Sequence, residues 1–186
     1  MKKSGSRRRE RMLLLEWLED RRLLANFLVN STADTVDLSP GDGLALDAYG
    51  NTTLRAAIME ANAFAGDDSI TLPAGTYRLT IGGTNEDAGA KGDLDISSNV
   101  TITGAGAGTT TIDAARLDRV LHVLSGATLD LSHVTITNGN ATGVNDGGGI
   151  CNAGMLYVSN SSIFGNWTWN DGGGIRNDHG TVEITS

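Results

Sequence analysis

Cysteine, proline and aromatic residues are scarce in this chain of 186 residues, and each scarcity excludes a class of protein. The single cysteine, Cys151, excludes an intrachain disulfide and a cysteine-ligated zinc site. With only 2 prolines, the chain is not a proline-rich disordered linker. The net charge of −8 argues against a nucleic-acid partner.

Glycine, by contrast, is abundant. The 25 glycines are about twice what the usual ~7% would give. Branched and small polar residues are also frequent. This composition favours many short strands joined by tight turns.

The segment 1–28 differs in composition from the rest of the chain, because 8 of the 14 basic residues lie in its first 22 positions. Its uninterrupted apolar run, Met12–Leu15, is shorter than the ~7–15 residues of a secretory h-region and far too short for a membrane span. Two interpretations stay open: an amphipathic helix with Leu14 and Leu18 on one face, or a targeting segment. "LEWLEDRRLLA" (Leu15–Ala25) resembles an N-terminal motif of large surface proteins from planctomycete-type bacteria. That resemblance implies export to the cell surface, the outer membrane or the extracellular space.

The segment 29–82 predicts one helix followed by strands. Apolar residues recur at helical spacing from Leu54 to Ala65, and Thr52 or Thr53 is placed to cap the start. With Gly66 ending it, the helix is expected at about 53–65. Alternating runs follow on both sides of a turn at 73–75. A helix in front of strands would cap the open end of a stacked sheet.

"TTLRAAIMEANA" (Thr52–Ala63) resembles the CSLREA domain, which precedes right-handed parallel β-helix repeats in bacterial surface and secreted proteins. The similarity continues through "DDSITLPAGTYRLT", "GDLDI", "VTITGAGAGTTTIDAA" and "VTITNGNA". It implies that 29–82 is a capping region. The family commonly has cysteines where this chain has Ala45 and Thr52, so a bridge between those positions, if they pair, is absent here.

The segment 83–186 is repetitive. "Leu-x-Leu" at Leu129–Leu131 aligns with Leu156–Val158 and Val182–Ile184, at steps of 27 and 26 residues. "VTIT" occurs at Val100–Thr103 and at Val134–Thr137. Coils of 20–30 residues with short strands indicate a β-solenoid. The predicted fold class is therefore all-β, a right-handed parallel β-helix with an N-terminal capping α-helix.

Alternation along these strands predicts which side chains point inward. The expected core consists of Ile96, Val100, Ile102, Ile112, Leu129, Leu131, Val134, Ile136, Ile150, Leu156, Val158, Ile163, Ile175, Val182 and Ile184. The last coil stops at Ser186 inside a strand pattern, so we expect a truncated array that associates with itself through this uncapped end.

The phrase "NDGGGI" occurs at Asn145–Ile150 and again at Asn170–Ile175. Neither copy has the lysine and following helix of a phosphate-binding loop, and "GAGAG" at Gly104–Gly108 leads into a strand-like run, so no nucleotide is expected. The 25-residue spacing instead predicts a repeated corner, similar to the glycine-rich motif of polymorphic outer-membrane protein repeats, although the Phe-x-x-Asn partner of that motif is altered at 163–166. The corner and its asparagine ladder are assigned to Gly147, Gly148, Gly149, Asn152, Gly172, Gly173, Gly174 and Asn177.

Two acidic residues and one free thiol accompany these repeats. Asp146 and Asp171 would stack in neighbouring coils, where either solvent or a weakly bound cation would separate them. Cys151 occupies a position that is arginine in the next copy, so we expect it to point outward or to be a tolerated small residue, and no thiol catalysis.

The outward positions carry the candidate ligand face. Asp130, Tyr157 and Glu183 each lie between two inward residues and should form one column. Trp167 and Trp169 flank a polar corner, where they either present aromatic faces or fold back onto the coil.

Asp130 and Glu183 would be about 9–10 Å apart, near the ~6.5–9.5 Å of inverting glycosidases. No lysine or arginine joins the column to act as a lyase base. We expect a noncatalytic secreted or cell-surface scaffold for adhesion that contacts carbohydrate or a surface protein, with no cofactor and no metal. The alternatives are a carbohydrate-active enzyme (a polysaccharide lyase or glycoside hydrolase) and a truncated fragment without independent function.

Overall fold

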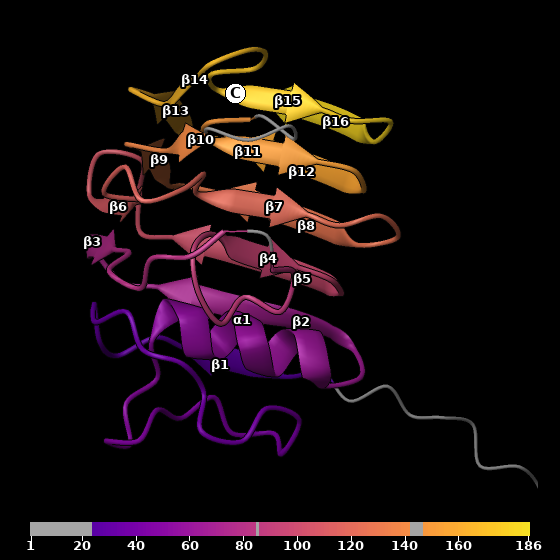
Figure 1. Cartoon of the computed structure of the whole chain (residues 1–186). Coiled ribbons are helices and arrows are strands. Elements are labelled where there is room, and N and C mark those ends of the chain that lie inside the picture. Colours follow the sequence, from indigo (N-terminus) through magenta and orange to yellow (C-terminus); the bar gives the residue numbers. More distant parts are fainter. Residues whose placement is uncertain (1–23, 85, 142–146) are drawn as a thin grey trace, which may run out of the picture.

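The computed structural model describes residues 24–84, 86–141 and 147–186. This part of the chain forms a parallel β-solenoid of about 3 turns with one short helix (Figure 1). The predicted all-β parallel solenoid is therefore confirmed. The elements are β1 (Asn26–Leu28), α1 (Leu54–Ala63), β2 (Asp67–Leu72), β3 (Gly75–Arg78), β4 (Leu94–Ile96), β5 (Asn99–Gly104), β6 (Thr110–Asp113), β7 (Leu121–Val123), β8 (Thr128–Ser132), β9 (Thr135–Thr137), β10 (Asn140–Ala141), β11 (Ile150–Asn152), β12 (Met155–Ser159), β13 (Ser162–Phe164), β14 (Trp167–Thr168), β15 (Ile175–Asn177) and β16 (Thr181–Thr185).

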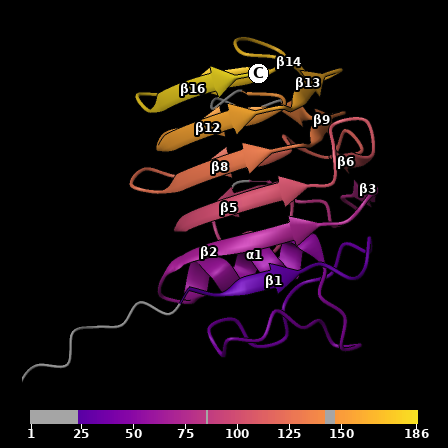
Figure 2. The ribbon, with the colours of Figure 1, turned by 180° about the vertical axis from the view of Figure 1, so that it is seen from behind.

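The strands form four parallel sheets. Sheet A has six strands in the order β1-β2-β5-β8-β12-β16, and Figure 2 shows them stacked one above the other. Sheet B has the order β13-β9-β6-β3, sheet C the order β15-β11-β7-β4, and sheet D pairs β10 with β14. Each turn of the solenoid thus contributes one strand to sheets A, B and C in succession.

The register in sheet A gives the length of each coil. Asp67, Asn99, Thr128, Met155 and Thr181 are register partners along the stack, so the step falls from 32 residues to 26. The two aligned Leu-x-Leu steps of 27 and 26 residues are confirmed by the pairing of β8, β12 and β16.

The two "VTIT" copies do not align. Val100 of β5 pairs with Leu129 in sheet A, whereas Thr135–Thr137 form β9 in sheet B. The same tetrapeptide suits both positions because β-branched alternation fits any strand that has one buried face. An identical short sequence therefore does not identify the face of a solenoid.

The core runs along the axis between sheets A, B and C. Eleven of the residues expected inside are buried, from Ile96 to Val158. Ile163, Ile175 and Val182 are only partly buried against this core, and Ile184 is 65% exposed, so the expectation is wrong for Ile184. The reason is that β16 is paired on one side only, with β12, whereas inner strands are covered from both sides.

The helix α1 is two residues shorter at its end than expected. The Thr53 hydroxyl accepts a hydrogen bond from the Ala56 amide at 3.2 Å, which makes Thr53 the N-cap. The helix ends at Ala63, and Phe64 is the extended C-cap residue, so Gly66 does not terminate it. The helix contacts β2, β4 and β5, and its role as an end cap stays a prediction.

The strands begin earlier in the chain than the expected boundaries. β1 lies inside the segment 1–28 and pairs with β2, and β2 and β3 lie inside 29–82. The solenoid sheets thus include residues that the sequence assigned to a targeting segment and to a capping region. The remainder of that targeting segment, 1–23, is outside the described residues.

Candidate functional site

The outer face of sheet A carries the predicted column. Tyr157 of β12 is in register with Asp130 of β8 on one side and with Glu183 of β16 on the other. All three side chains are exposed, because their chain neighbours point into the core. Thr101 of β5 extends the column beyond Asp130 and is also exposed.

Asp130 and Tyr157 line two shallow hollows on this face. One of about 170 Å³ is lined by Asp130, Tyr157 and Glu183, and another of about 280 Å³ is lined by Thr101, Asp130 and Tyr157. A phenol ring between carboxylates offers an apolar face for stacking and oxygen atoms that accept hydrogen bonds from hydroxyl groups. This combination is suited to a polyhydroxylated ligand.

The tryptophans lie elsewhere. Trp167 belongs to β14 of sheet D, so the structure does not bring the tryptophan pair into the sheet A column. The rings of Trp167 and Trp169 pack edge to face, with centroids 4.9 Å apart and an interplanar angle of 71°. Both remain exposed, Trp169 to 71%. The pair therefore stacks on itself while still presenting aromatic surface.

The asparagines at the repeated corner are hydrogen-bonded from coil to coil. Asn152 Nδ2 donates to Asn177 Oδ1 at 2.8 Å and to the Thr181 carbonyl at 3.0 Å. Asn152 Oδ1 accepts from the Gly154 amide at 3.2 Å. Because Asn152 is fully buried, these bonds satisfy an amide that would otherwise be costly to bury.

The glycines of this corner do not share one role. Only Gly147 and Gly172, the first of each copy, have positive φ, of 122° and 73°. A Cβ at Gly148 or Gly149 would instead collide with carbonyl oxygens of the next coil. Positive φ is therefore not what requires glycine at Gly148, Gly149, Gly173 and Gly174.

Gly173 and Gly174 have more room for a side chain. At Gly173 the nearest atom to an added Cβ is 3.3 Å away, and at Gly174 it is 3.6 Å away. The first copy is confined because its carbonyls and amides bond to β7 and to the second copy on opposite sides. Asp146 lies outside the described residues, so the Asp146/Asp171 pair is not placed; Asp171 is exposed.

The outer face of sheet C carries a buried polar cluster that sequence reasoning missed. One register column of this face consists of Asp95, His122, Cys151 and Arg176. The segment between β3 and β4 crosses over the start of this column, at Asp95 and His122. Cys151 points away from the core as expected, yet it is buried. Burial raises the pKa of the Cys151 thiol, which makes it a poor nucleophile.

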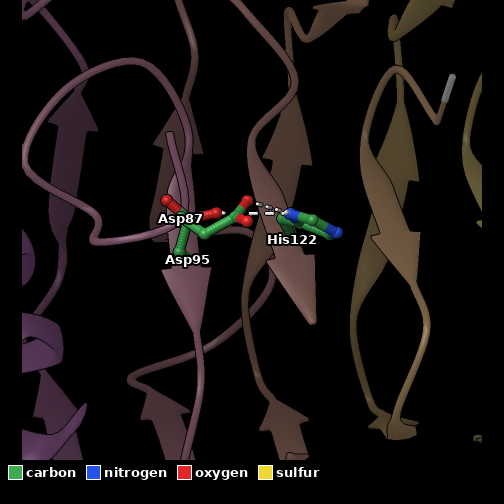
Figure 3. Close-up of side chains that lie close together, drawn as sticks. All are labelled: Asp87, Asp95 and His122. Atoms are coloured by element: carbon green, nitrogen blue, oxygen red, sulfur yellow. Dashed lines mark ion pairs between the residues drawn. The ribbon is translucent and has the colours of Figure 1, made fainter. Parts of the chain in front are cut away.

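Three side chains of this face converge in Figure 3. His122 Nδ1 lies 3.3 Å from Asp95 Oδ1 and 3.6 Å from Asp87 Oδ1. Asp95 is fully buried, His122 is largely buried, and Asp87 is 69% exposed at the solvent side. The Gly89 amide donates to Asp95 Oδ2 at 2.9 Å and so fixes the orientation of that carboxylate.

Two more buried carboxylates surround this group. Burial, together with the charge of Asp95, raises the pKa of Asp93 to about 7, although Arg119 acts in the opposite direction with its Nε 2.7 Å from Asp93 Oδ2. Burial also raises the pKa of Asp95 and of Asp118. Burial therefore disfavours the charged form of all three carboxyl groups.

Arg55 of α1 anchors the crossing segment from below. Its guanidinium is fully buried and donates to the carbonyls of Gly89 at 2.7 Å and Gly92 at 2.9 Å. Its Nε lies 2.6 Å from Asp34 Oδ1. The arginine of the "TTLRAAI" motif therefore ties the N-terminal region, the helix and this segment together.

Two general observations complete the description. In the described part of the chain, no helix has the length and apolar character that a membrane crossing requires. Comparison of the chain with protein-family models, with curated proteins and with solved structures gives no match.

Proposed function

We propose that this protein is a noncatalytic β-solenoid scaffold, exported to the cell surface, the outer membrane or the medium, that contacts carbohydrate through the outer face of sheet A. The observation that carries the proposal is the exposed column of Asp130, Tyr157 and Glu183 in three successive strands. The location rests on the resemblance of Leu15–Ala25 and Thr52–Ala63 to surface-protein motifs.

The column suits a chain-like neutral ligand. Successive strands lie about 4.8 Å apart, so the polar and aromatic groups repeat along a straight line on a rigid sheet. The two hollows beside Tyr157 leave its ring accessible. A net charge of −8 repels polyanions and thereby favours neutral glycans.

The same geometry argues against catalysis. Glycosidases hold their two carboxyl groups in environments that push the pKa values apart. Asp130 and Glu183 instead occupy equivalent exposed positions on either side of Tyr157, so burial does not distinguish their surroundings. The enzyme alternative is favoured only by their expected separation, which is close to the inverting range.

Calorimetric titration tests the binding role. The probes are hexasaccharides of glucose, mannose and N-acetylglucosamine, with a hexamer of galacturonic acid as the anionic comparison. We expect saturable binding of a neutral hexamer and about 2–13-fold weaker binding by Tyr157→Ala, since one aromatic stacking contact contributes ~0.5–1.5 kcal/mol. Tyr49→Ala, which removes a ring outside sheet A that is more exposed than Tyr157 (84% against 37%), should bind like the wild type.

Two results decide against the proposal. If the wild type and Tyr157→Ala bind the hexamer equally well, the outer face of sheet A is not the contact surface. Polysaccharide cleavage that disappears in the double variant Asp130→Ala/Glu183→Ala would favour the enzyme alternative.

A further inference from the structure

Three metal-ligand side chains meet on the outer face of sheet C, each from a different part of the chain. Asp95 comes from β4, His122 from β7 and Asp87 from the segment between β3 and β4. One ligand atom of each lies within 4.8 Å of the others. Figure 3 shows the two carboxylates directed at the imidazole.

The separations fit a shared ion better than direct hydrogen bonds. A charge-assisted bond from imidazole to carboxylate would be about 2.7–2.9 Å long. The observed Nδ1–Oδ1 distances are 3.3 Å to Asp95 and 3.6 Å to Asp87. A tetrahedral ion with ligand bonds of about 2.0–2.1 Å holds its ligand atoms roughly 3.3 Å apart.

The two oxygens of the buried Asp95 carboxylate have different partners. Oδ1 is in contact with His122 Nδ1 at 3.3 Å, which is longer than a good hydrogen bond, whereas Oδ2 accepts one from the Gly89 amide at 2.9 Å. The Asp95 side chain has no exposed surface, so solvent does not compensate Oδ1. An ion bound to both Asp95 Oδ1 and His122 Nδ1 would replace this long contact by two ligand bonds.

The surrounding charge also favours a cation. Asp93 and Asp118 are buried close to Asp95, and Asp118 Oδ2 has no hydrogen bond to any described residue. Arg119 provides one positive charge, paired with Asp93 at 2.7 Å. Because a nearby cation favours the ionised form of a carboxyl group, a bound ion would offset the burial of Asp93, Asp95 and Asp118.

We infer that Asp87, Asp95 and His122 bind one divalent transition-metal ion of the Zn²⁺ type. One imidazole nitrogen and two carboxylate oxygens form a common zinc donor set, whereas Ca²⁺ and Mg²⁺ prefer oxygen ligands throughout. The exposed Asp87 places the fourth position at the solvent side, where water completes the tetrahedron.

The ion would have a structural role. The crossing segment is already held by Arg55 through Gly89 and Gly92, and by Asp95 through the Gly89 amide. A bond from Asp87 to the ion would add a link between this segment and two neighbouring strands of sheet C. This role is independent of ligand binding on sheet A.

The test uses the full chain, stripped with a chelator and titrated with ZnCl₂ against a chromophoric indicator. We expect one equivalent of Zn²⁺ per chain, and at least about a 10–100-fold loss of affinity in Asp95→Asn and His122→Gln. The matched control is His179→Gln, since His179 Nδ1 also faces an aspartate, Asp178 Oδ1 at 3.0 Å, but on the exposed surface and without a third ligand. It should bind Zn²⁺ like the wild type.

Two further measurements still test the site if Asp95→Asn or His122→Gln fails to fold. Asp87→Ala removes an exposed ligand without touching the core, so a loss of affinity in a variant with a wild-type circular dichroism spectrum supports the site. Zn²⁺ should also slow hydrogen exchange of the amides at 86–95 in the wild type. The inference is overturned if the wild type binds no equivalent of Zn²⁺, if Asp87→Ala and His122→Gln bind it unchanged, or if Ca²⁺ displaces it at equal concentration.

Discussion

Replacing Arg55 by methionine should destabilise the protein more than any exposed substitution. Methionine keeps much of the apolar stem and removes the guanidinium, whose loss leaves the buried Asp34 carboxylate without its ion-pair partner at 2.6 Å. The carbonyls of Gly89, Asp93 and Gly92 lose donors at 2.7, 3.2 and 2.9 Å.

The expected magnitude follows from burial. Breaking a buried ion pair by removing one partner costs about 3–5 kcal/mol, because the remaining charge stays uncompensated. The amides of Thr80 and Ile81 still donate to Asp34 Oδ2, at 2.6 and 2.9 Å, so we expect the lower half of that range. Because these two hydrogen bonds still stabilise the Asp34 carboxylate, the expected loss in the free energy of unfolding is about 3–4 kcal/mol.

Urea denaturation followed by circular dichroism measures this change. With a slope of about 2 kcal/mol per molar urea, the midpoint should fall by roughly 1.5–2 M. Arg78→Met removes an exposed guanidinium and should change stability by less than about 0.5 kcal/mol. A loss below about 1 kcal/mol in Arg55→Met would refute the assignment of Arg55 as an anchor.

Three further changes test other parts of the structure. Asn152→Ala removes the buried corner amide and should cost about 1–3 kcal/mol in urea denaturation, whereas the same change at the exposed Asn177 should cost less. Burial and the neighbouring Glu60 raise the pKa of Asp37 to about 6 from 3.8, so the unfolded chain loses this proton at a lower pH than the folded chain does, and stability falls as the pH rises through this range. The free energy of unfolding should fall by about 1–3 kcal/mol between pH 4 and pH 7, and Asp37→Asn should flatten this part of the pH profile. Gly154→Ala places a methyl group against two carbonyl oxygens of the preceding coil and should cost about 1–3 kcal/mol in the same denaturation assay.

The sequence predicted the stacking because it repeats at nearly constant steps. Leu129, Leu156 and Val182 recur at 27 and 26 residues, and these steps are the register of sheet A. The same alternation placed Asp130, Tyr157 and Glu183 in one outward column. Periodicity carries this information because a strand alternates faces with a period of two.

The polar cluster on sheet C was not predictable in the same way. Asp95 and His122 each stand between two core residues, and that alternation marks them as outward. Their pairing, however, depends on coil lengths that vary, and the position of Asp87 depends on a crossing segment without repeats. The burial of Asp95 follows from that segment, so no local pattern reveals it.

The exposure of Ile184 shows that alternation along a strand does not by itself predict burial. The alternation correctly aligns Ile184 with Val158, yet burial needs a strand on each side, and β16 has one partner. Self-association through this strand stays a prediction, which light scattering of the wild type and of Ile184→Lys tests.

The central proposal is that sheet A binds carbohydrate without cleaving it. The most direct measurement incubates the protein with the neutral hexasaccharide that it binds and records both the calorimetric affinity and the chromatographic length of the recovered sugar. The account predicts saturable binding, weakened about 2–13-fold by Tyr157→Ala, and a hexasaccharide recovered intact. Shortened products, or an affinity that Tyr157→Ala leaves unchanged, would contradict it.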